Sequence, residues 1–347
     1  MWPFPIQYGS VVAADFNKDG KMDLAFAIHL TGVRVFLGDG KGHFVDSSSG
    51  LATDNFPTRR LRVADLDHDG WPDLLAISEG PTARQIDKPA GKVLAFLNRK
   101  AGTRWEQVDA AAPQHVVGGD SLTVGKFNSD VYPDFVGGSV FFQASELIYL
   151  SAGPKKWEPV KSDGDVVPYL SYYNGLTAGH YSSKKLDDAI MSFTRFWPEV
   201  DRNAIPTPPL KSVVGLDRVT FTGKEPVRVP IVRMAGDRPI MGVASGDFDG
   251  DGNLDIIYVA YQPKREFVIL LGDGKGGFKR ARLEGITAAP NTNYDVTVAD
   301  VNNDGRPDVV IAYESSKQTR LGVQDGSIHV FLNRGVVNAA KEKRSEK

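Results

Sequence analysis

Six copies of one acidic nine-residue pattern divide this chain of 347 residues into repeats. The most complete copy is Asp247-Phe-Asp249-Gly-Asp251-Gly252-Asn-Leu-Asp255. Carboxylates at its positions 1, 3, 5 and 9 can converge on one calcium ion, and the glycine at position 6 permits the sharp turn that folds them inward. Apolar runs of strand type flank the loop, and no glutamate stands at position 12. The pattern therefore predicts a calcium site between two strands.

Three other copies, which begin at Asp15, Asp65 and Asp300, also keep oxygen ligands at all four side-chain positions. Position 7 would add a backbone carbonyl to each set. We therefore expect four bound calcium ions with a structural role, one in each of the first, second, fifth and sixth loops. The predicted ligands are Asp15, Asn17, Asp19, Lys21, Asp23, Asp65, Asp67, Asp69, Trp71, Asp73, Asp247, Asp249, Asp251, Asn253, Asp255, Asp300, Asn302, Asp304, Arg306 and Asp308.

The third and fourth copies have lost this ligand set. Lys126 replaces the first aspartate of the third loop, and His180 and Lys184 occupy ligand positions in the fourth. We expect both loops to be free of metal. The ammonium groups of Lys126 and Lys184 could replace the missing cation, and their expected partners are Asp130, Asp134 and Asp188.

Apolar runs return in the same order around each loop. A short run precedes it, a β-rich run such as Ile256–Val259 follows it, and a third strand such as Val268–Leu271 comes next. A glycine-rich hairpin then leads to a fourth strand. Four short strands in roughly fifty residues are typical of a β-propeller blade, and helical periodicity is missing. The fourth strands are predicted to begin at the aromatic residues Phe44, Trp105, Trp157 and Phe278.

The fold expected from these repeats is all-β, a single propeller of six four-stranded blades over residues 1–338, with a charged tail over 339–347. The last repeat ends after its third strand, and Trp2–Tyr8 precedes the first loop. We expect this N-terminal segment to supply the missing outer strand and close the ring. A seventh blade would require residues 188–247 to contain one without a recognisable loop.

The hairpins Leu37–Phe44 and Leu271–Phe278, together with the aspartate loops, resemble the VCBS/FG-GAP repeat family. These are the repeats of integrin α-chain propellers and of many secreted bacterial and fungal proteins. The resemblance covers nearly the whole chain and implies calcium between the first two strands of a blade. It implies no single activity, because members include adhesion modules, glycan-binding modules and some polysaccharide lyases.

The amino-acid composition limits the classes of partner that the protein can be expected to bind. The net charge is −2, so no general basic field favours nucleic acid. No apolar segment is long enough to span a membrane, and cysteine is absent, which excludes disulfides. Calcium loops are usually loaded outside the cytosol, so we expect an extracellular or periplasmic monomer. Because Met1–Pro5 does not resemble a signal peptide, an exported form is expected to have lost its leader.

Three motifs that suggest other chemistry are better explained by the repeat. Gly272–Gly277 has the spacing of a dinucleotide fingerprint but lies between two strands, where a hairpin turn is expected. Ser182–Lys185 has the Ser-x-x-Lys spacing of acyl-transfer enzymes but falls inside the degenerate fourth loop. The six histidines show no zinc-ligand spacing. No residue is assigned as catalytic.

Long connections between the second and third strands occur in blades two, four and six, over residues 79–91, 195–215 and 314–325. Strand alternation places them at the end of each blade opposite the calcium loop, together with the connections between blades. Loops projected from a rigid scaffold often bind ligands. The candidate ligand-binding residues are Arg84, His115, Tyr172, Tyr173, Arg195, Trp197, Arg202, Tyr294 and Arg320.

Trp197 is the centre of this hypothesis. An aromatic plate with flanking polar residues suits a sugar ring, whose C–H face stacks on it. The alternative is that Phe196 and Trp197 only pack the insertion onto the rim of the propeller.

Two functions follow from these observations. The first is a calcium-stabilised extracellular module without catalysis that binds a glycan or a cell-surface protein. The second is a lyase acting on acidic polysaccharide, in which an arginine or lysine neutralises the uronate while His115 or a tyrosine removes the α-proton.

Overall fold

The structure is a computed structural model of the 347 residues. The chain divides into two compact units: unit 1 contains Met1–Ala178 and Leu186–Pro239, and unit 2 contains Gly179–Lys185 and Ile240–Lys347. In the part of the chain that the structure describes, no helix is long and apolar enough to cross a membrane. The described residues are 9–29, 31–78, 92–111, 119, 121–138, 147–160, 171–172, 175–196, 212–222, 226–238, 240, 242–261, 265–284, 293–314, 318–319, 322–323 and 326–335.

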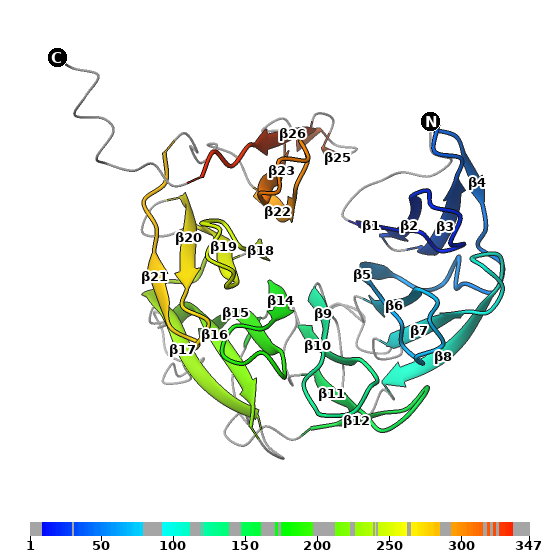
Figure 1. Ribbon diagram of the computed structural model, residues 1–347, viewed down its shortest axis with the longest axis horizontal. Coiled ribbons are helices and arrows are strands. Elements are labelled where there is room, and N and C mark those ends of the chain that lie inside the picture. Colours follow the sequence, from blue (N-terminus) through cyan, green and yellow to red (C-terminus); the bar gives the residue numbers. More distant parts are fainter. Residues whose placement is uncertain are drawn as a thin grey trace, which may run out of the picture. The chain divides into compact units, whose positions relative to one another are not determined.

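The strands of unit 1 form four antiparallel sheets, each built from consecutive strands of the chain (Figure 1). The fourth sheet has the longest strands, and β14 pairs with β15 off its main path. The four sheets are β1 (Ser10–Ala14), β2 (Asp23–Ile28), β3 (Gly32–Gly38) and β4 (Phe44–Asp46); β5 (Thr58–Ala64), β6 (Asp73–Ser78), β7 (Val93–Asn98) and β8 (Trp105–Ala111); β9 (Ser121–Gly125), β10 (Asp134–Gly138), β11 (Leu147–Ser151) and β12 (Trp157–Pro159); and β13 (Ser171–Tyr172), β14 (Leu176–Gly179), β15 (Asp188–Phe196), β16 (Ser212–Phe221) and β17 (Pro226–Ala235).

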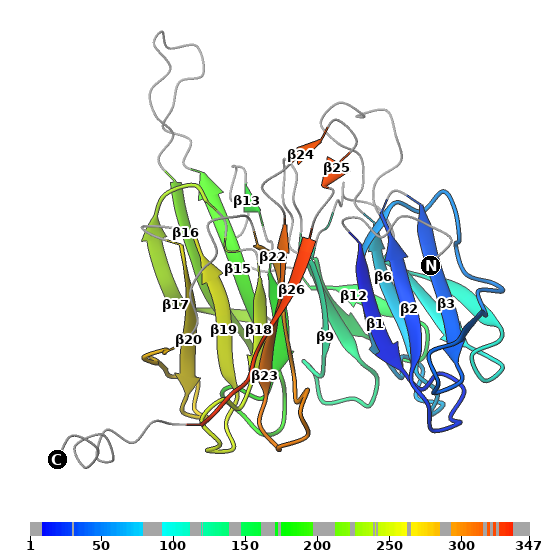
Figure 2. The same ribbon diagram turned by 90° about the horizontal axis from the view of Figure 1, so that it is seen from above.

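Unit 2 holds two further antiparallel sheets of the same kind. The connection between β23 and β26 contains a short hairpin. It lies at the end of the blade opposite the acidic loop (Figure 2). The first sheet is β18 (Val243–Gly246), β19 (Asp255–Ala260), β20 (Glu266–Gly272) and β21 (Phe278–Arg280); the second is β22 (Asn293–Ala299), β23 (Asp308–Glu314) and β26 (Gly326–Phe331), with β24 (Gln318–Thr319) and β25 (Gly322–Val323) as the hairpin.

The six sheets are the blades of a six-bladed β-propeller, as the sequence predicted. The stretch 188–247 that could have contained a seventh blade instead supplies β15, β16 and β17, which are nine or ten residues long. The four aromatic residues predicted to open fourth strands are the first residues of β4, β8, β12 and β21. The predicted closing strand, residues 2–8, lies outside the described residues.

The hydrophobic core lies between adjacent blades. One buried cluster joins blades one and two, a second joins blades two and three, a third joins blades three and four, and a fourth joins blades five and six. Because both faces of an inner strand meet a neighbouring layer, β6, β7 and β19 are buried at every residue. Continuous apolar runs in the sequence follow from this arrangement.

The second residue of the acidic loop anchors one blade to the next. Phe16 packs edge to face on Trp105, with ring centroids 5.5 Å apart. The Asn98 side chain donates a hydrogen bond to the Phe16 carbonyl at 2.8 Å. The same bond recurs between Asn333 and the Phe248 carbonyl at 2.9 Å. The first and fifth acidic loops are therefore held both by their own blade and by the following one.

Candidate functional site

Four of the six acidic loops share one backbone conformation. Position 6 is a glycine in the left-handed region, where other residues are strained, and position 4 is also left-handed. In the described third and fourth loops, neither Val131 nor Lys185 at position 6 has a positive φ. The loops predicted to hold metal are thus the ones with this double turn. The φ values are 82°, 87°, 85° and 83° at Gly20, Gly70, Gly252 and Gly305, and 57°, 60°, 77° and 57° at Lys18, His68, Gly250 and Asn303.

The carboxylate at position 1 closes this double turn. In the fifth loop, Asp247 accepts hydrogen bonds from the backbone N–H groups of Asp251 at 3.0 Å and Gly252 at 2.9 Å. Asp251 in turn accepts the N–H of Asn253 at 2.8 Å. The first, second and sixth loops repeat these bonds. Each carboxylate oxygen has a further lone pair, so the turn orders the loop while leaving oxygen atoms available for a cation.

The aspartate at position 9 links the loop to the third strand. Asp255 is fully buried, and it accepts the N–H of Phe248 at 2.7 Å and of Gly272 at 2.8 Å. Burial raises the pKa of Asp255 to about 6 and that of Asp73 to about 7, although backbone donors oppose the shift. Equivalent pairs of bonds are made by Asp23, Asp73, Asp134 and Asp308.

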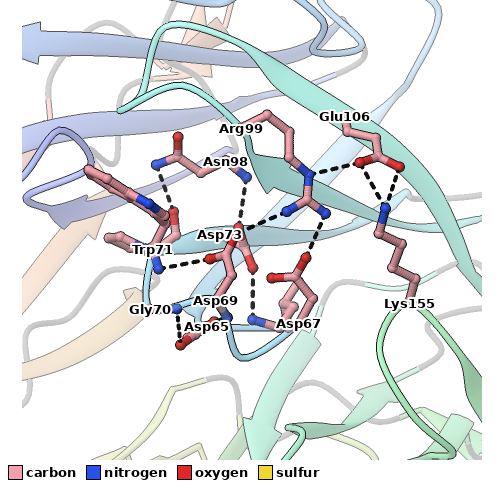
Figure 3. A network of polar contacts seen from close by, with 12 residues as sticks. Asp65, Asp67, Asp69, Gly70, Trp71, Asp73, Asn98, Arg99, Glu106 and Lys155 are labelled. Carbon is pink, nitrogen blue, oxygen red and sulfur yellow. Dashed lines mark hydrogen bonds and ion pairs between the residues drawn. The ribbon is translucent and has the colours of Figure 1, made fainter.

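Among the described residues, the structure brings together two acidic groups that could hold a metal ion. They are Asp65, Asp67 and Asp73 in the second loop and Asp247, Asp249 and Asp255 in the fifth, and within each group the ligand oxygens lie within 4.8 Å of one another. The side chain of Asp67 is only 7% exposed, and its Oδ1 is buried without a hydrogen-bond partner (Figure 3). A buried, unpaired carboxylate oxygen in a set of hard oxygen donors fits calcium.

The first and sixth loops carry an asparagine at position 3 and a cationic residue at position 7. The ammonium group of Lys21 lies 3.2 Å from Asp19, and the guanidinium group of Arg306 lies 2.7 Å from Asp304. These exposed pairs are weak, so they leave the predicted ligand sets intact. The predicted use of these two loops by metal stays a prediction.

The expected replacement of metal by lysine in the third and fourth loops is wrong. Lys126 and Lys184 make no ion pair among the described residues, and the Lys126 N–H donates instead to Asp187 at 2.8 Å. Asp130 is satisfied by the hydroxyl of Ser151, at 2.8 and 2.9 Å, and by the Asn128 side chain. For lysine side chains this exposed, the conformational entropy lost on fixing the side chain exceeds the electrostatic free energy gained from an ion pair in water.

Asp188 in the fourth loop forms an ion pair with an arginine: Nη1 of Arg218 on β16 lies 3.4 Å from Asp188 Oδ1. Sequence reasoning missed both Ser151 and Arg218. Ser151 could have been found, because it ends a third strand, at the position of Asn98 in blade two.

Most of the predicted ligand-binding residues cannot be placed. Arg84, His115, Tyr173, Trp197, Arg202 and Arg320 lie outside the described residues. The backbones of Tyr172 and Tyr294 belong to β13 and β22, and their side chains lie outside the described part. Arg195 is described, and its guanidinium group stacks on Phe193 at 4.4 Å and lies 3.5 Å from Asp217.

Arg195 belongs to an arginine group that the sequence did not reveal. Asp217 is 1% exposed on the middle strand of blade four and also forms ion pairs with Arg228 and Arg233 on β17. Burial, followed by the neighbouring charge of Arg233, lowers the pKa of Arg228 to about 10. Among the described residues, three guanidinium groups therefore face one carboxylate.

The combination of antiparallel blades with acidic loops between first and second strands defines a class of β-propellers with an acidic loop in each repeat. Family models agree with it: an FG-GAP-like repeat matches residues 15–76 and 247–311, and an FG-GAP repeat matches residues 292–331. All four intact loops lie within stretches that match FG-GAP repeat models. A search of curated proteins found no match.

Several solved structures are similar to this chain at low sequence identity. A rhamnogalacturonan lyase from Bacillus licheniformis is 11% identical, with 94% of this chain and 72% of that chain covered and a TM-score of 0.43. YjhT is 12% identical, with 94% and 98% covered and a TM-score of 0.49. BBS1N, solved in complex with ARL6DN, is 12% identical, with 94% and 92% covered and a TM-score of 0.42.

Proposed function

We propose that this protein is a calcium-stabilised extracellular binding module. The observation that carries the calcium part is the shared geometry of the four intact loops. Their double turn is ordered by backbone donors, and in the second and fifth loops the carboxylate oxygens converge. Bound calcium would supply the positive charge that offsets the repulsion within each acidic set. The extracellular assignment is supported by the family, whose calcium loops suit a calcium-rich compartment.

Calcium binding is tested by calorimetric titration of protein freed of metal by chelator. We expect about four ions to bind per chain. The variant Asp251→Asn, at a position that is aspartate in all four intact loops, should weaken binding at the fifth loop, whereas Asp54→Asn, which changes an exposed acid outside the loops, should leave the titration unchanged. A chain that binds no calcium, or a titration that Asp251→Asn leaves intact, would contradict the proposal.

The binding partner is proposed to be a glycan or an extracellular protein. It would dock on the connections at the end of each blade opposite the acidic loops, where the loops are longest in blades two, four and six. Blade four also carries the arginine group around Asp217, and guanidinium groups form strong paired hydrogen bonds with carboxylates. An acidic glycan such as a uronate polymer is therefore the preferred partner.

A glycan array in calcium buffer tests this part of the proposal. Trp197→Ala should abolish binding while the protein still melts cooperatively. Trp71→Phe is the matched control, because Trp71 lies in an acidic loop and should not affect a ligand at the other end. An array that stays silent would contradict glycan recognition. Depolymerisation of a uronate polymer, followed by the ultraviolet absorbance of its unsaturated product, would replace the binding module by the lyase alternative.

A further inference from the structure

The second and fifth loops have the same acidic residues at positions 1, 3, 5 and 9, yet their surroundings differ in charge. We propose that Arg99 is a built-in counter-ion of the second loop, which competes with calcium and makes this site much weaker than the fifth. The inference rests on the proposed binding of calcium by these loops. The ligand residues of the two loops do not by themselves predict a difference in calcium affinity.

The guanidinium group of Arg99 spans two ligand positions (Figure 3). Its Nη2 lies 2.5 Å from Asp67 Oδ2 and its Nη1 lies 2.9 Å from Asp69 Oδ2. These carboxylates stand at positions 3 and 5 of the loop. A planar guanidinium fork suits two carboxylate oxygens, and such charge-assisted bonds are stronger than neutral ones. A calcium ion that needs these carboxylates must therefore displace the guanidinium group.

Arg99 is itself held in place from the other side. Its Nε lies 2.8 Å from Glu106 Oε2, and Glu106 also contacts the ammonium group of Lys155 at 2.8 and 3.0 Å (Figure 3). The side chain of Arg99 is 25% exposed, so its interactions are less screened than those of a fully exposed residue. Glu106 gives the displaced guanidinium group a remaining partner, so displacement is costly but feasible.

The fifth loop has a carboxylate at the equivalent position. The N–H of Asn98 bonds to Asp73, and the N–H of Gly272 bonds to Asp255, so the next residues, Arg99 and Asp273, correspond. Asp273 accepts backbone N–H groups of its own hairpin, from Lys275 and Gly277, each at 2.8 Å. No basic side chain pairs with Asp247, Asp249 or Asp251 among the described residues. The fifth loop therefore depends on a metal ion for its neutralisation.

The neutralisation by Arg99 is incomplete. Its two ion pairs use Asp67 Oδ2 and Asp69 Oδ2, whereas Asp67 Oδ1 remains buried without a hydrogen-bond partner. Lys18, whose ammonium group lies 4.4 Å above the Trp71 ring, adds positive charge nearby without pairing with the loop. The second loop is thus a site of reduced affinity and keeps the oxygen atoms that a cation needs.

Trp71 permits a measurement that reports on this loop alone. It stands at position 7 of the second loop, where lysine, asparagine and arginine stand in the other three intact loops. A terbium ion bound there would be sensitised by the indole ring, and calcium would displace it. The titration is made on the full chain, and Trp71→Phe must remove the signal, which excludes sensitisation by other tryptophans.

Arg99→Gln should raise the affinity of the Trp71-reported site for terbium and calcium at least about tenfold. Arg104→Gln removes the same charge from an exposed residue of the same hairpin and should change it less than about twofold. Arg99→Lys keeps the charge without the fork, so its affinity should be intermediate. Unchanged or weaker binding by folded Arg99→Gln would overturn the inference, as would equal effects of the Arg99 and Arg104 variants.

Calorimetry on the same proteins separates the two proposals. If wild-type protein binds calcium at the fifth loop and Arg99→Gln leaves the Trp71-reported affinity unchanged, only the role of Arg99 fails. If no calcium binds at any loop, the proposed calcium module fails. Melting in chelator monitors folding: Arg99→Gln should melt lower than wild type without metal and gain more on calcium addition, because ligand binding stabilises the folded state. An equal gain would count against the inference.

Discussion

At the scale of single residues, the aspartate at position 9 of the acidic loop has two roles, and the sequence pattern does not distinguish them. It is a predicted metal ligand in four loops, but it also accepts two backbone N–H groups in five blades, including blade three, whose loop has Lys126 in place of the first aspartate. In blade three the second role stands alone. Asp134 is fully buried there and accepts N–H groups from Phe127, Asn128 and Ser151.

Asp134 allows a prediction about pH. Burial raises its pKa from 3.8 to about 6 in the folded protein, because desolvation of the charged form outweighs the three backbone donors. Since the folded state then holds its proton more tightly than the unfolded chain, the stability from this group is complete below pH 3.8 and is lost as the pH rises through about 6. The free energy of unfolding should fall by up to about 1.4 kcal/mol per pH unit from this residue.

Urea unfolding in chelator at several pH values measures this slope. Asp134→Asn removes the titrating proton while keeping one carbonyl acceptor, so its slope between pH 4 and 7 should be less negative than that of wild type by about one proton. Other buried aspartates titrate in both proteins and cancel in the difference. Parallel curves for the two proteins would show that Asp134 has an ordinary pKa.

At the scale of elements, blade four departs most from the repeat. Its acidic loop is degenerate, its strands β15, β16 and β17 are the longest, and its middle strand carries a buried carboxylate among arginines. The register explains the meeting of charges: Asp217 pairs with Met191 on one side and Pro230 on the other, next to a β-bulge. The blade with this buried ion-pair group is thus also one whose acidic loop lacks the predicted metal ligands.

Asp217→Asn should therefore be strongly destabilising. It leaves the guanidinium groups of Arg195, Arg228 and Arg233 without their shared carboxylate, and removing one partner of a buried ion pair typically costs about 3–5 kcal/mol. Arg233→Gln, at a side chain 36% exposed, should cost about 1 kcal/mol or less. Urea unfolding of both variants measures the difference. Equal and small losses would mean that solvent already neutralises the group.

The ion pairs of Arg99 in blade two join segments that are far apart in the chain. Arg99 and Asp67 are 32 residues apart, and Arg99 follows β7 whereas Asp67 follows β5. The residues at the end of the third strand set the charge next to the acidic loop. They are Asn98-Arg99 in blade two and Gly272-Asp273 in blade five. The ending of one strand can thus tune a loop between two others.

At the scale of the whole molecule, repetition makes the fold robust to the loss of individual loops. Four core clusters each lie between two neighbouring blades, and the first and fifth loops are anchored by their second residues in the next blade. Stability in such an arrangement is close to a sum over neighbours. Two loops could therefore lose their ligands while blades three and four kept their sheets.

The sequence by itself determined the fold class and the loop conformations, and it favoured six blades over seven. Strand alternation, fourth-strand aromatics and the glycines at position 6 act over a few neighbouring residues, so a contiguous pattern is enough to predict them. The matched spacing of six loops also fixed where the candidate metal groups would lie.

Only the tertiary structure decided which charges meet. The lysines of the degenerate loops, which sequence proximity favoured, make no ion pair within the described part of the chain, whereas Ser151, Arg218 and Arg99 contact the acidic groups from distant strands. Register, side-chain rotamer and burial select these partners, and they depend on how strands far apart in the chain are aligned. For that reason the sequence predicted the ligand positions, and the structure showed that one of two identical ligand sets already holds an arginine.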